Sequence, residues 1–477
     1  MRVYRPEATG TAASTDLPMV GRAGELGAIR LRLSRLIDEG QGGLVVLEGA
    51  PGIGKSRLAT AFVEEARDAG ASVLRGVALA VESTSPLYAW RGLFEEIFGV
   101  RDAVDPVARR TQVADRLTAQ LPDDAPLLPL LNPIVLTDFP ETDRSAGLRD
   151  VARGMATMEL LGRVLAALPA GSACKAVLVE DAQWFDSASW SLSGVVHQVP
   201  GVLLLLTMRP MEQVPAAVGL TEADLHLRLQ PLDAADCLQV VANRLGVRTL
   251  PDEVVRLIRE RSEGNPLFSE ELAYALRDAG VIVTDGEECR LGVGDLRAVA
   301  IPNTVQSAMT SRIDRLPVDS QLALKTASVI GRVFGADVLR GVCPVGDSSI
   351  VPALVAGLID RDLLLDDRSL DEVYTFKHAL LQDVAYDLML GAQRRQLHRA
   401  VAEWMEAQPA GLRGRYAALA YHWTRVLEYG DTSELALTKA IDNLASAADE
   451  AAAAFAHREA AEFLQEALRL LARLPDT

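Results

Sequence analysis

Residues Gly49–Ser56 read "GAPGIGKS", directly after the apolar stretch "LVVLE" (44–48) and directly before "RLATAFVEEA" (57–66). Glycines at 49, 52 and 54 let the backbone turn its N–H groups inward, and a helix beginning near Lys55 adds the positive end of its dipole. Lys55 can then reach the β- and γ-phosphates of a nucleotide, while Ser56 offers a hydroxyl to Mg²⁺. The motif and its strand–helix context predict a phosphate-binding P-loop.

The bulk properties limit the classes of protein to consider. A chain of 477 residues is too long for one hydrophobic core, and its net charge of −17 argues against general attraction to nucleic acid or an anionic membrane. The apolar run "GVLLLLTM" is far shorter than the roughly 20 residues that span a bilayer. We expect a cytoplasmic protein with reduced thiols, since its four cysteines lie far apart: Cys174, Cys237, Cys289 and Cys343.

The first half of the chain predicts an α/β P-loop NTPase domain, AAA+-like, over residues 18–230, preceded by a polar linker or tail at 1–17. Strand-like and helix-like segments alternate there, which indicates a parallel sheet. The expected strands are 44–48, 72–77, 176–180, 202–207 and 225–229. Almost a hundred residues separate the second strand from the third, and their apolar spacing predicts a helical insertion at 78–175 of unknown role.

The second half predicts three further regions. Segments with proline or acidic starts indicate a helical lid at 231–300. At 301–392, three helix-like segments precede "LLLDDRSLDEVYTF", two expected short strands joined by an acidic turn, and this order favours a winged helix. The pattern at 393–477 is helical and predicts the start of a TPR-like repeat region.

The last helix of that region carries one expected apolar stripe: Ala460, Phe463, Leu464, Ala467, Leu468 and Leu471. Stacked helical repeats generally need about three units to bury such stripes. We therefore expect the chain to stop inside a longer array.

Two more strand ends carry candidate chemistry. In "AVLVEDAQWFD", Glu180 and Asp181 follow an apolar strand, where one carboxylate can hold Mg²⁺ through water and its neighbour can orient an attacking water. In "LLLLTMRP", Thr207 and Arg209 lie at the edge where open α/β sheets bind ligands, so the arginine can sense a γ-phosphate. The alternatives are an ordinary polar strand end and a surface arginine that caps a strand.

Six motifs together resemble a known family. In chain order they are "MVGRAGELGAI", "GAPGIGKSRL", "LVEDAQWFD", "LLTMRP", "ERSEGNPLF" and "FKHALLQDVAY". They are similar to the STAND class of signal-transduction ATPases, a branch of the AAA+-like P-loop proteins. The likeness covers about residues 18–400 and points to the ATPase module of bacterial class III (soluble-type) adenylate cyclases and of LuxR-type regulators.

The resemblance implies roles at matching positions. Glu180 and Asp181 match the Walker B acids and Arg209 the sensor arginine, so these three are the expected catalytic residues. Ser56 and Glu180 are expected to hold Mg²⁺, partly through water. The residues expected to bind ATP or ADP are Val20, Gly21, Arg22, Gly49, Ala50, Pro51, Gly52, Ile53, Gly54, Lys55, Ser56, Arg57, Pro266 and His378.

Three of these segments have particular places in the family. Residues 20–22 lie against the adenine, and Gly264-Asn265-Pro266 match a turn of the lid that touches the nucleotide. His378 matches a winged-helix histidine that contacts the β-phosphate of ADP in relatives such as NOD-like receptors and apoptotic scaffolds. Gln183 and Ala379 depart from the family, which often has histidine and aspartate there, so a packed or helix-capping His378 is the alternative.

The resemblance implies a slow regulatory ATPase that acts as an ATP/ADP switch in signal transduction. The charge of the γ-phosphate then decides whether lid and winged helix stay docked. Expected partners are a protein bound by the helical C-terminus, further copies of the chain in the ATP state, and a class III cyclase domain. The cyclase domain is expected because "MRVYRPE" resembles the tail that follows such a domain. Cyclase activity itself is not predicted. The alternatives are a DNA-binding AAA+ initiator or loader and a scaffold that binds nucleotide without hydrolysis.

Overall fold

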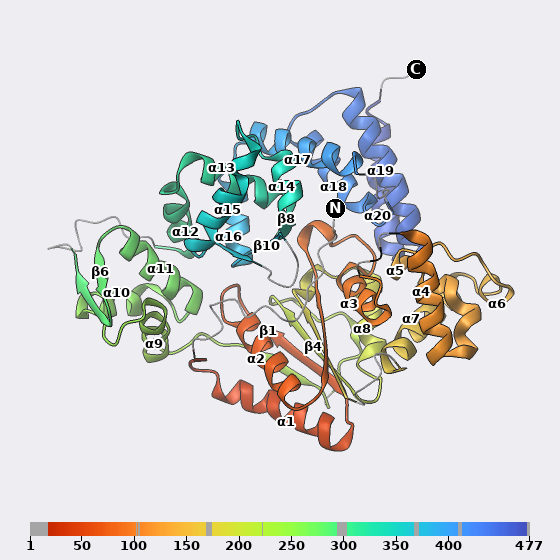
Figure 1. Cartoon of the computed structure of the whole chain (residues 1–477), viewed down its shortest axis with the longest axis horizontal. Coiled ribbons are helices and arrows are strands. Elements are labelled where there is room, and N and C mark those ends of the chain that lie inside the picture. The colour runs from red at the N-terminus through yellow and green to blue at the C-terminus, as the bar shows by residue number, and fades with distance from the viewer. Residues whose placement is uncertain are drawn as a thin grey trace.

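A parallel five-stranded sheet lies at the centre of the molecule (Figure 1). The computed structural model describes residues 18–101, 103, 105–167, 174–221, 223–292, 303–366, 372–408 and 413–474. The expected tail at 1–17 lies outside these residues. The strands are β1 (Gly43–Glu48), β2 (Ser72–Val77), β3 (Lys175–Glu180), β4 (Val202–Met208) and β5 (Leu225–Arg228). The order β2-β3-β4-β1-β5 and the parallel pairing confirm the predicted sheet.

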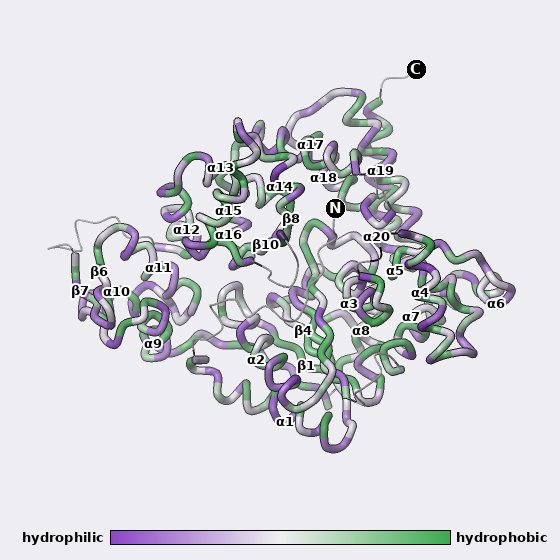
Figure 2. The backbone as a smooth tube through the Cα atoms, viewed as in Figure 1, coloured by the Kyte–Doolittle hydropathy of each residue, from purple (hydrophilic) through white to green (hydrophobic). Residues whose placement is uncertain are grey.

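Both faces of this sheet are covered, which explains its unbroken apolar strands. Val45 and Leu47 pack towards α1 (Ala23–Glu39) and α2 (Lys55–Asp68), while Leu44 and Val46 belong to the core on the opposite face. Figure 2 shows β1 and β4 as apolar segments in the interior. The carboxyl ends of β1, β3 and β4 therefore come together at one edge.

The long connection between β2 and β3 is helical, as predicted. It packs with α8 (Ser187–Val196) on the face of the sheet opposite α1. Its helices are α3 (Tyr88–Phe98), α4 (Pro106–Gln120), α5 (Asn132–Val135), α6 (Asp143–Ala146) and α7 (Asp150–Ala167), with 3₁₀ segments at Ala80–Glu82 (η1) and Pro122–Leu131 (η2). Trp90, Phe94 and Phe98 of α3 are fully buried in this core.

The region after the sheet is less purely helical than predicted. It contains α9 (Ala234–Leu245), α10 (Asp252–Arg261) and α11 (Pro266–Asp278), followed by a hairpin of β6 (Ile282–Asp285) and β7 (Glu288–Leu291). Gly286 in the hairpin turn has φ +58°, which explains the Asp-Gly pair there. The lid prediction missed these two strands because each has only four residues.

The next region combines helices with a three-stranded antiparallel sheet of order β8-β10-β9. Its helices are α12 (Val305–Asp314), α13 (Val318–Ile330), α14 (Ala336–Val342), α15 (Val351–Asp360) and α16 (Ala379–Asp387). Its strands are β8 (Val333–Gly335), β9 (Leu364–Asp366) and β10 (Val373–Phe376). The predicted strand pair is confirmed, although residues 367–371 of its turn lie outside the described part. Four helices rather than three precede β9, β8 was missed, and the winged helix stays a prediction.

Four helices end the chain, as the periodicity predicts: α17 (Gly391–Glu406), α18 (Tyr416–Glu428), α19 (Glu434–Ala453) and α20 (His457–Leu471). The predicted stripe on α20 is wrong in part, because Leu464, Leu468 and Leu471 are exposed at 50%, 66% and 52%. Ala460, Phe463 and Ala467 of the stripe are buried as predicted, and Leu470, which the prediction left out, is buried with them. The buried face is rotated because α20 packs on both α19 and α8. Whether these helices are TPR-like stays a prediction.

The far end of the chain returns to the ATPase half. Glu459 of α20 is buried and accepts hydrogen bonds from the backbone N–H of Ser187 (2.9 Å) and from its hydroxyl (2.5 Å), at the start of α8. Figure 1 shows α19 and α20 beside the helices of the insertion. The insertion thus forms part of the surface on which the terminal helices rest.

Two bulk expectations can be compared with the structure. All four cysteines are free thiols. Within the described part of the chain, no helix has both the length and the apolar character that crossing a bilayer requires.

Candidate functional site

The P-loop joins β1 to α2 in the expected conformation. Gly52 has φ +78° and Gly54 φ +104°, values that residues with a side chain rarely adopt. α2 begins at Lys55, whose ammonium donates to the carbonyls of Gly49 (2.7 Å) and Ala50 (3.0 Å). Ser56 is exposed at the first turn. The loop therefore presents its backbone and one buried lysine at the sheet edge.

The charges that surround Lys55 come from three parts of the chain. Burial lowers the pKa of Lys55 to about 8; Asp181 and Glu180 oppose this shift, and Arg209 and Arg332 add to it. The predicted catalytic residues Glu180, Asp181 and Arg209 are thus gathered around the P-loop lysine. An anion bound beside this ammonium would favour its charged form.

Glu180 ends β3 with a carboxylate that is only partly satisfied. One oxygen, Oε2, lies 4.0 Å from the guanidinium of Arg75 on β2. The other, Oε1, is inaccessible to solvent and has no hydrogen-bond partner. Buried carboxylate oxygens normally have partners, and a hydrated cation is a partner that suits oxygen ligands.

Asp181 follows in a left-handed conformation with φ +59°. Its backbone N–H donates to the Thr207 hydroxyl (3.1 Å), which ties β3 to β4. Gln183 donates to Asp181 Oδ1 (3.0 Å) and accepts from the backbone N–H of Arg209 (3.0 Å). Gln183, where many relatives of the resembled family have histidine, therefore bridges the candidate catalytic residues.

Two residues of the region 303–392, for which a winged helix is predicted, contact these same side chains. Arg332, directly before β8, forms an ion pair and hydrogen bond with Asp181 Oδ2. Asp383 on α16 lies 3.7 Å from the Arg209 guanidinium. Sequence reasoning missed both residues. No motif contains Arg332, and Asp383 received no role although it lies in "FKHALLQDVAY", because their partners are more than a hundred residues away in the chain.

The residues expected beside the adenine lie next to the P-loop. Arg22 is buried, and its Nη2 donates to the carbonyls of Ile53 (3.0 Å) and Gln230 (2.8 Å). Gly21 has φ +68°, and a Cβ there would lie 2.2 Å from Asp236 Oδ2. Arg22 thus holds the P-loop backbone to the segment that leads into the lid, with half-buried Val20 beside it.

The turn at 264–266 also reaches the P-loop. The Asn265 side-chain amide donates to the carbonyl of Pro51 (3.0 Å), and the Leu267 N–H donates to that of Gly52 (3.3 Å). Pro266 opens α11, with Asn265 as its N-cap. A Cβ on Gly52 would lie 2.5 Å from Leu267 Cβ, so the close contact requires glycine.

His378 lies directly before α16, where its side chain makes no capping hydrogen bond. Its Nε2 is inaccessible to solvent and has no partner. Burial, together with the positive charges of Arg244, Arg332 and Arg312, lowers the pKa of His378 to about 3. The ring is therefore neutral at pH 7 in a region rich in guanidinium groups.

The residues present fit a magnesium–nucleotide. Gly52 and Gly54 give the P-loop its left-handed turn, Lys55 is buried beside it, and Glu180 has an unpartnered oxygen. Ser56 is exposed at the start of α2. The neighbouring Arg57 donates a hydrogen bond to the carbonyl of Pro18 (3.1 Å). Backbone N–H groups, lysine and carboxylate are the donor set that a triphosphate and its Mg²⁺ require.

Two stretches of the chain match known family models. Residues 18–205 match the model of an AAA ATPase domain, and residues 235–290 match a domain of unknown function. An uncharacterized protein of Rhizobium meliloti (strain 1021) is 25% identical over 96% of this chain and 43% of its own length. Human adenylate cyclase type 10 is 18% identical over 73% of this chain and 24% of its own length. The chain thus spans less than half the length of either relative.

Similar solved structures include Drosophila ORC bound to DNA, with 13% identity over 82% of this chain and 95% of that one, at a TM-score of 0.35. Another is Cdc6p from Pyrobaculum aerophilum, with 11% identity over 83% and 97% and a TM-score of 0.35. At such TM-scores these likenesses carry no argument about function.

Proposed function

Because residues 18–205 form an AAA-type ATPase domain, we propose that the chain is a regulatory ATPase of the STAND type. Its nucleotide state sets whether the region 303–392 stays docked on the sheet edge. One observation carries this proposal: Arg332 and Asp383 of that region contact Asp181 and Arg209. Asp181 and Arg209, which would act on the γ-phosphate, are therefore also the residues that contact the region 303–392.

The roles of the residues follow from their positions. The P-loop N–H groups and Lys55 would bind the phosphates, and Ser56 and Glu180 would hold Mg²⁺, whose chemistry would be to supply positive charge beside the phosphate oxygens. Asp181 orients a water, and Arg209 contacts the γ-phosphate. Arg22, Val20 and Pro266 line the side of the P-loop where the base would lie.

Docking and hydrolysis compete for Asp181. Its two carboxylate oxygens accept hydrogen bonds from Gln183 and Arg332, so they are engaged when the region 303–392 is docked. The Arg332 guanidinium takes one acceptor site of Oδ2 and stabilises the negative charge of the carboxylate, so Asp181 is a weaker acceptor for a water while this pair is intact. Hydrolysis is then faster after release of Arg332, and this dependence slows turnover and couples it to undocking.

The partners proposed for this switch follow from the family resemblance and from one relative. The helical C-terminus would bind a protein partner or further copies of the chain in the ATP state. The alignment with adenylate cyclase type 10 supports an association with a cyclase, whereas the LuxR-type resemblance supports a transcriptional regulator. The proposed location is the cytoplasm.

Hydrogen exchange on the two nucleotide forms tests the switch. With a non-hydrolysable ATP analogue, peptides covering residues 328–336 and 376–388 should exchange faster than with ADP, because their contacts to the sheet edge are lost. The α19 peptide is the control and should not change. Equal exchange in the two forms at both contact segments would contradict the proposal.

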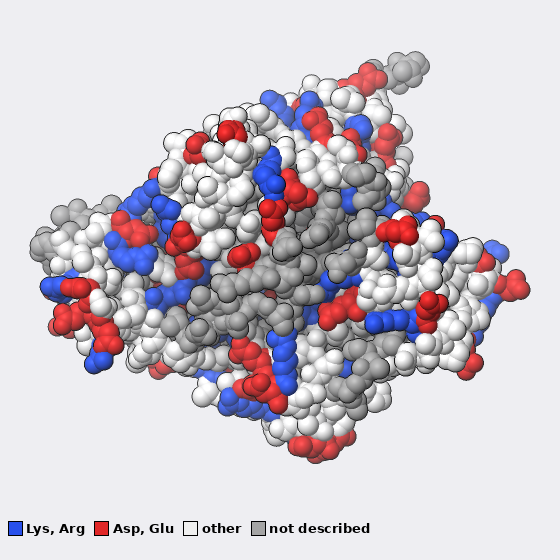
Figure 3. Space-filling model, in the orientation of Figure 1, with Lys and Arg blue, Asp and Glu red and all other residues white. Residues whose placement is uncertain are grey.

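The DNA-binding ATPase is the alternative, and a salt titration separates it from the switch. On the face drawn in Figure 3, basic and acidic side chains are intermixed. A steep loss of duplex binding with salt would favour the alternative, because it reports phosphate contacts. The third candidate is a scaffold that binds nucleotide without hydrolysing it. It predicts that the wild-type protein releases no more phosphate than Asp181→Asn does.

A further inference from the structure

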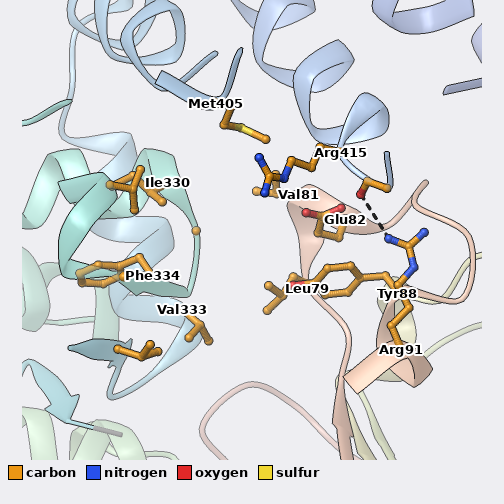
Figure 4. Close-up of a pocket in the computed structure, with 15 residues that line it drawn as sticks. Leu79, Val81, Glu82, Tyr88, Arg91, Ile330, Val333, Phe334, Met405 and Arg415 are labelled. Carbon is orange, nitrogen blue, oxygen red and sulfur yellow. Dashed lines mark hydrogen bonds between the residues drawn. The ribbon is translucent and has the colours of Figure 1, made fainter. Parts of the chain in front are cut away.

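A small cavity lies away from the P-loop, where three parts of the chain meet (Figure 4). Its volume is about 70 Å³. The first wall comes from residues 79–91 after β2, the second from α13 to β10, and the third from the end of α17 and the start of α18. A molecule held here would touch the ATPase domain, the winged-helix region and the terminal helices together.

Most of the lining is apolar. The apolar side chains around the cavity are Leu79, Val81, Ile330, Val333, Phe334 and Met405. Figure 4 shows Ile330, Phe334 and Val333 on one side and Leu79, Val81 and Tyr88 facing them. Such walls suit the hydrocarbon part of a ligand.

Arg415 adds a positive charge to this lining. Its side chain is only 7% exposed, and its Nη1 is inaccessible to solvent and has no hydrogen-bond partner. Burial lowers the pKa of Arg415, and no neighbouring charge among the described residues opposes the shift. In Figure 4 the guanidinium lies between Met405 and Glu82 and points towards the side of Ile330.

The other two charged groups of the cavity have hydrogen-bond partners and lie near opposite charges, although Arg91 Nε itself has no partner. Arg91 donates to the carbonyls of Pro86 (2.9 Å) and Gly414 (3.2 Å). Glu82 accepts a hydrogen bond from the Ser85 hydroxyl, and burial raises its pKa while Arg91 lowers it. The uncompensated charge is therefore that of Arg415, and a buried guanidinium normally has an anionic partner.

We propose that this cavity binds a short-chain carboxylate, whose carboxylate pairs with Arg415 and whose hydrocarbon part packs on Val333 and Phe334. The volume of about 70 Å³ suits about five or six non-hydrogen atoms, since one water needs roughly 10–15 Å³ on this measure. A monoanion fits better than a phosphate dianion, because Glu82 contributes a second acidic group and the walls are apolar.

The position of the site gives the ligand a regulatory effect. A molecule that contacts all three walls binds only while they are docked, so it stabilises the docked arrangement. This inference does not depend on the nucleotide switch, since no P-loop residue lines the cavity.

Thermal unfolding in increasing sodium propionate, at constant ionic strength, tests the proposal. The wild-type protein should unfold at rising temperature, whereas propionamide, of the same shape without charge, should have no effect. Arg415→Gln should weaken the apparent affinity about tenfold or more, because a charge-assisted hydrogen bond is lost. Lys55→Ala should keep the full response, which excludes binding at the P-loop.

The matched control is Arg469→Gln, an exposed arginine of α20 that pairs with Glu466 and should respond as the wild type does. Without ligand, Arg415→Gln should unfold at the same temperature as the wild type or higher, since it removes an uncompensated buried charge. A large fall would show that Arg415 has a structural partner and would overturn the proposal. The proposal is also overturned if propionate does not raise the unfolding temperature, if propionamide raises it as much, or if Arg415→Gln responds to propionate as the wild type does.

Discussion

The ion pair of Arg332 with Asp181 offers the sharpest test of how the nucleotide site is coupled to the downstream region. Arg332→Gln removes the guanidinium charge and keeps most of the side-chain length. Both side chains of this pair are only 18% exposed, so solvent screens them weakly. We expect the docked arrangement to lose about 1–3 kcal/mol relative to the undocked one, which is roughly 5- to 150-fold in the docking equilibrium.

The second contact should matter less. Arg209 and Asp383 are 32% and 53% exposed at 3.7 Å, and exposed pairs contribute about 0–1 kcal/mol. Asp383→Asn should therefore shift the equilibrium less than about fivefold. The two variants give an expected rank order that depends only on burial and distance.

The assay is release of a fluorescent ADP analogue after a chase with excess ATP, together with steady-state ATP turnover. Arg332→Gln should release ADP faster and turn over ATP faster than the wild type. Arg340→Gln is the control, because Arg340 pairs with Glu372 inside the winged-helix region, away from the P-loop. A folded Arg332→Gln protein with wild-type release would refute the coupling, as would an equal effect of Arg340→Gln.

Three further outcomes are expected. Lys55→Ala should abolish ATP binding in calorimetry, because the buried ammonium is lost from the P-loop, and unchanged affinity would remove the phosphate-site assignment. Asp181→Asn should bind ATP yet stop phosphate release, and normal turnover would place the water-orienting group elsewhere. His378 has a folded pKa of about 3, below its unfolded value of about 6.5, so the wild type should lose stability as the pH falls through this window. At pH 5, His378→Gln should avoid about 2 kcal/mol of that loss in denaturant unfolding, and parallel pH profiles of the two proteins would show that the ring is not buried in its neutral form.

Patterns of neighbouring residues were enough to predict the strands and the loop whose conformation depends mainly on neighbouring residues. The strands at 44–48 and 72–77 were predicted to within one residue, because they are buried on both faces and carry unbroken apolar runs. The P-loop was predicted because glycine spacing and the helix after it define its conformation without any distant contact. The hairpin at 282–291 and the strand β8 escaped detection, because short strands are stabilised by neighbours that the sequence does not identify.

The candidate site likewise contains residues that the sequence could locate and residues that it could not. Its motif residues could be located from the sequence, and the parallel sheet brings Lys55, Glu180, Asp181 and Arg209 together as the strand ends required. Arg332 and Arg415 lie in no motif, and Asp383 lies in one that assigns it no role. The importance of these residues comes from partners present or absent in three dimensions. The stripe on α20 shows the same limit, because helical spacing defines an apolar face without saying how far neighbouring helices cover it.

The sequence by itself determined a phosphate-binding loop on a parallel sheet and the helical character of the last region of the chain, α17 to α20. Both depend on residues close together in the chain, through backbone conformation and hydrophobic period. Only the tertiary structure decided that an arginine before β8 contacts Asp181 and that the turn at 264–266 packs on the P-loop. It also decided that Glu459, near the far end of the chain, accepts a hydrogen bond from Ser187 at the start of α8. These contacts join segments up to 272 residues apart, and their free energy depends on burial and partner geometry, which no local pattern encodes.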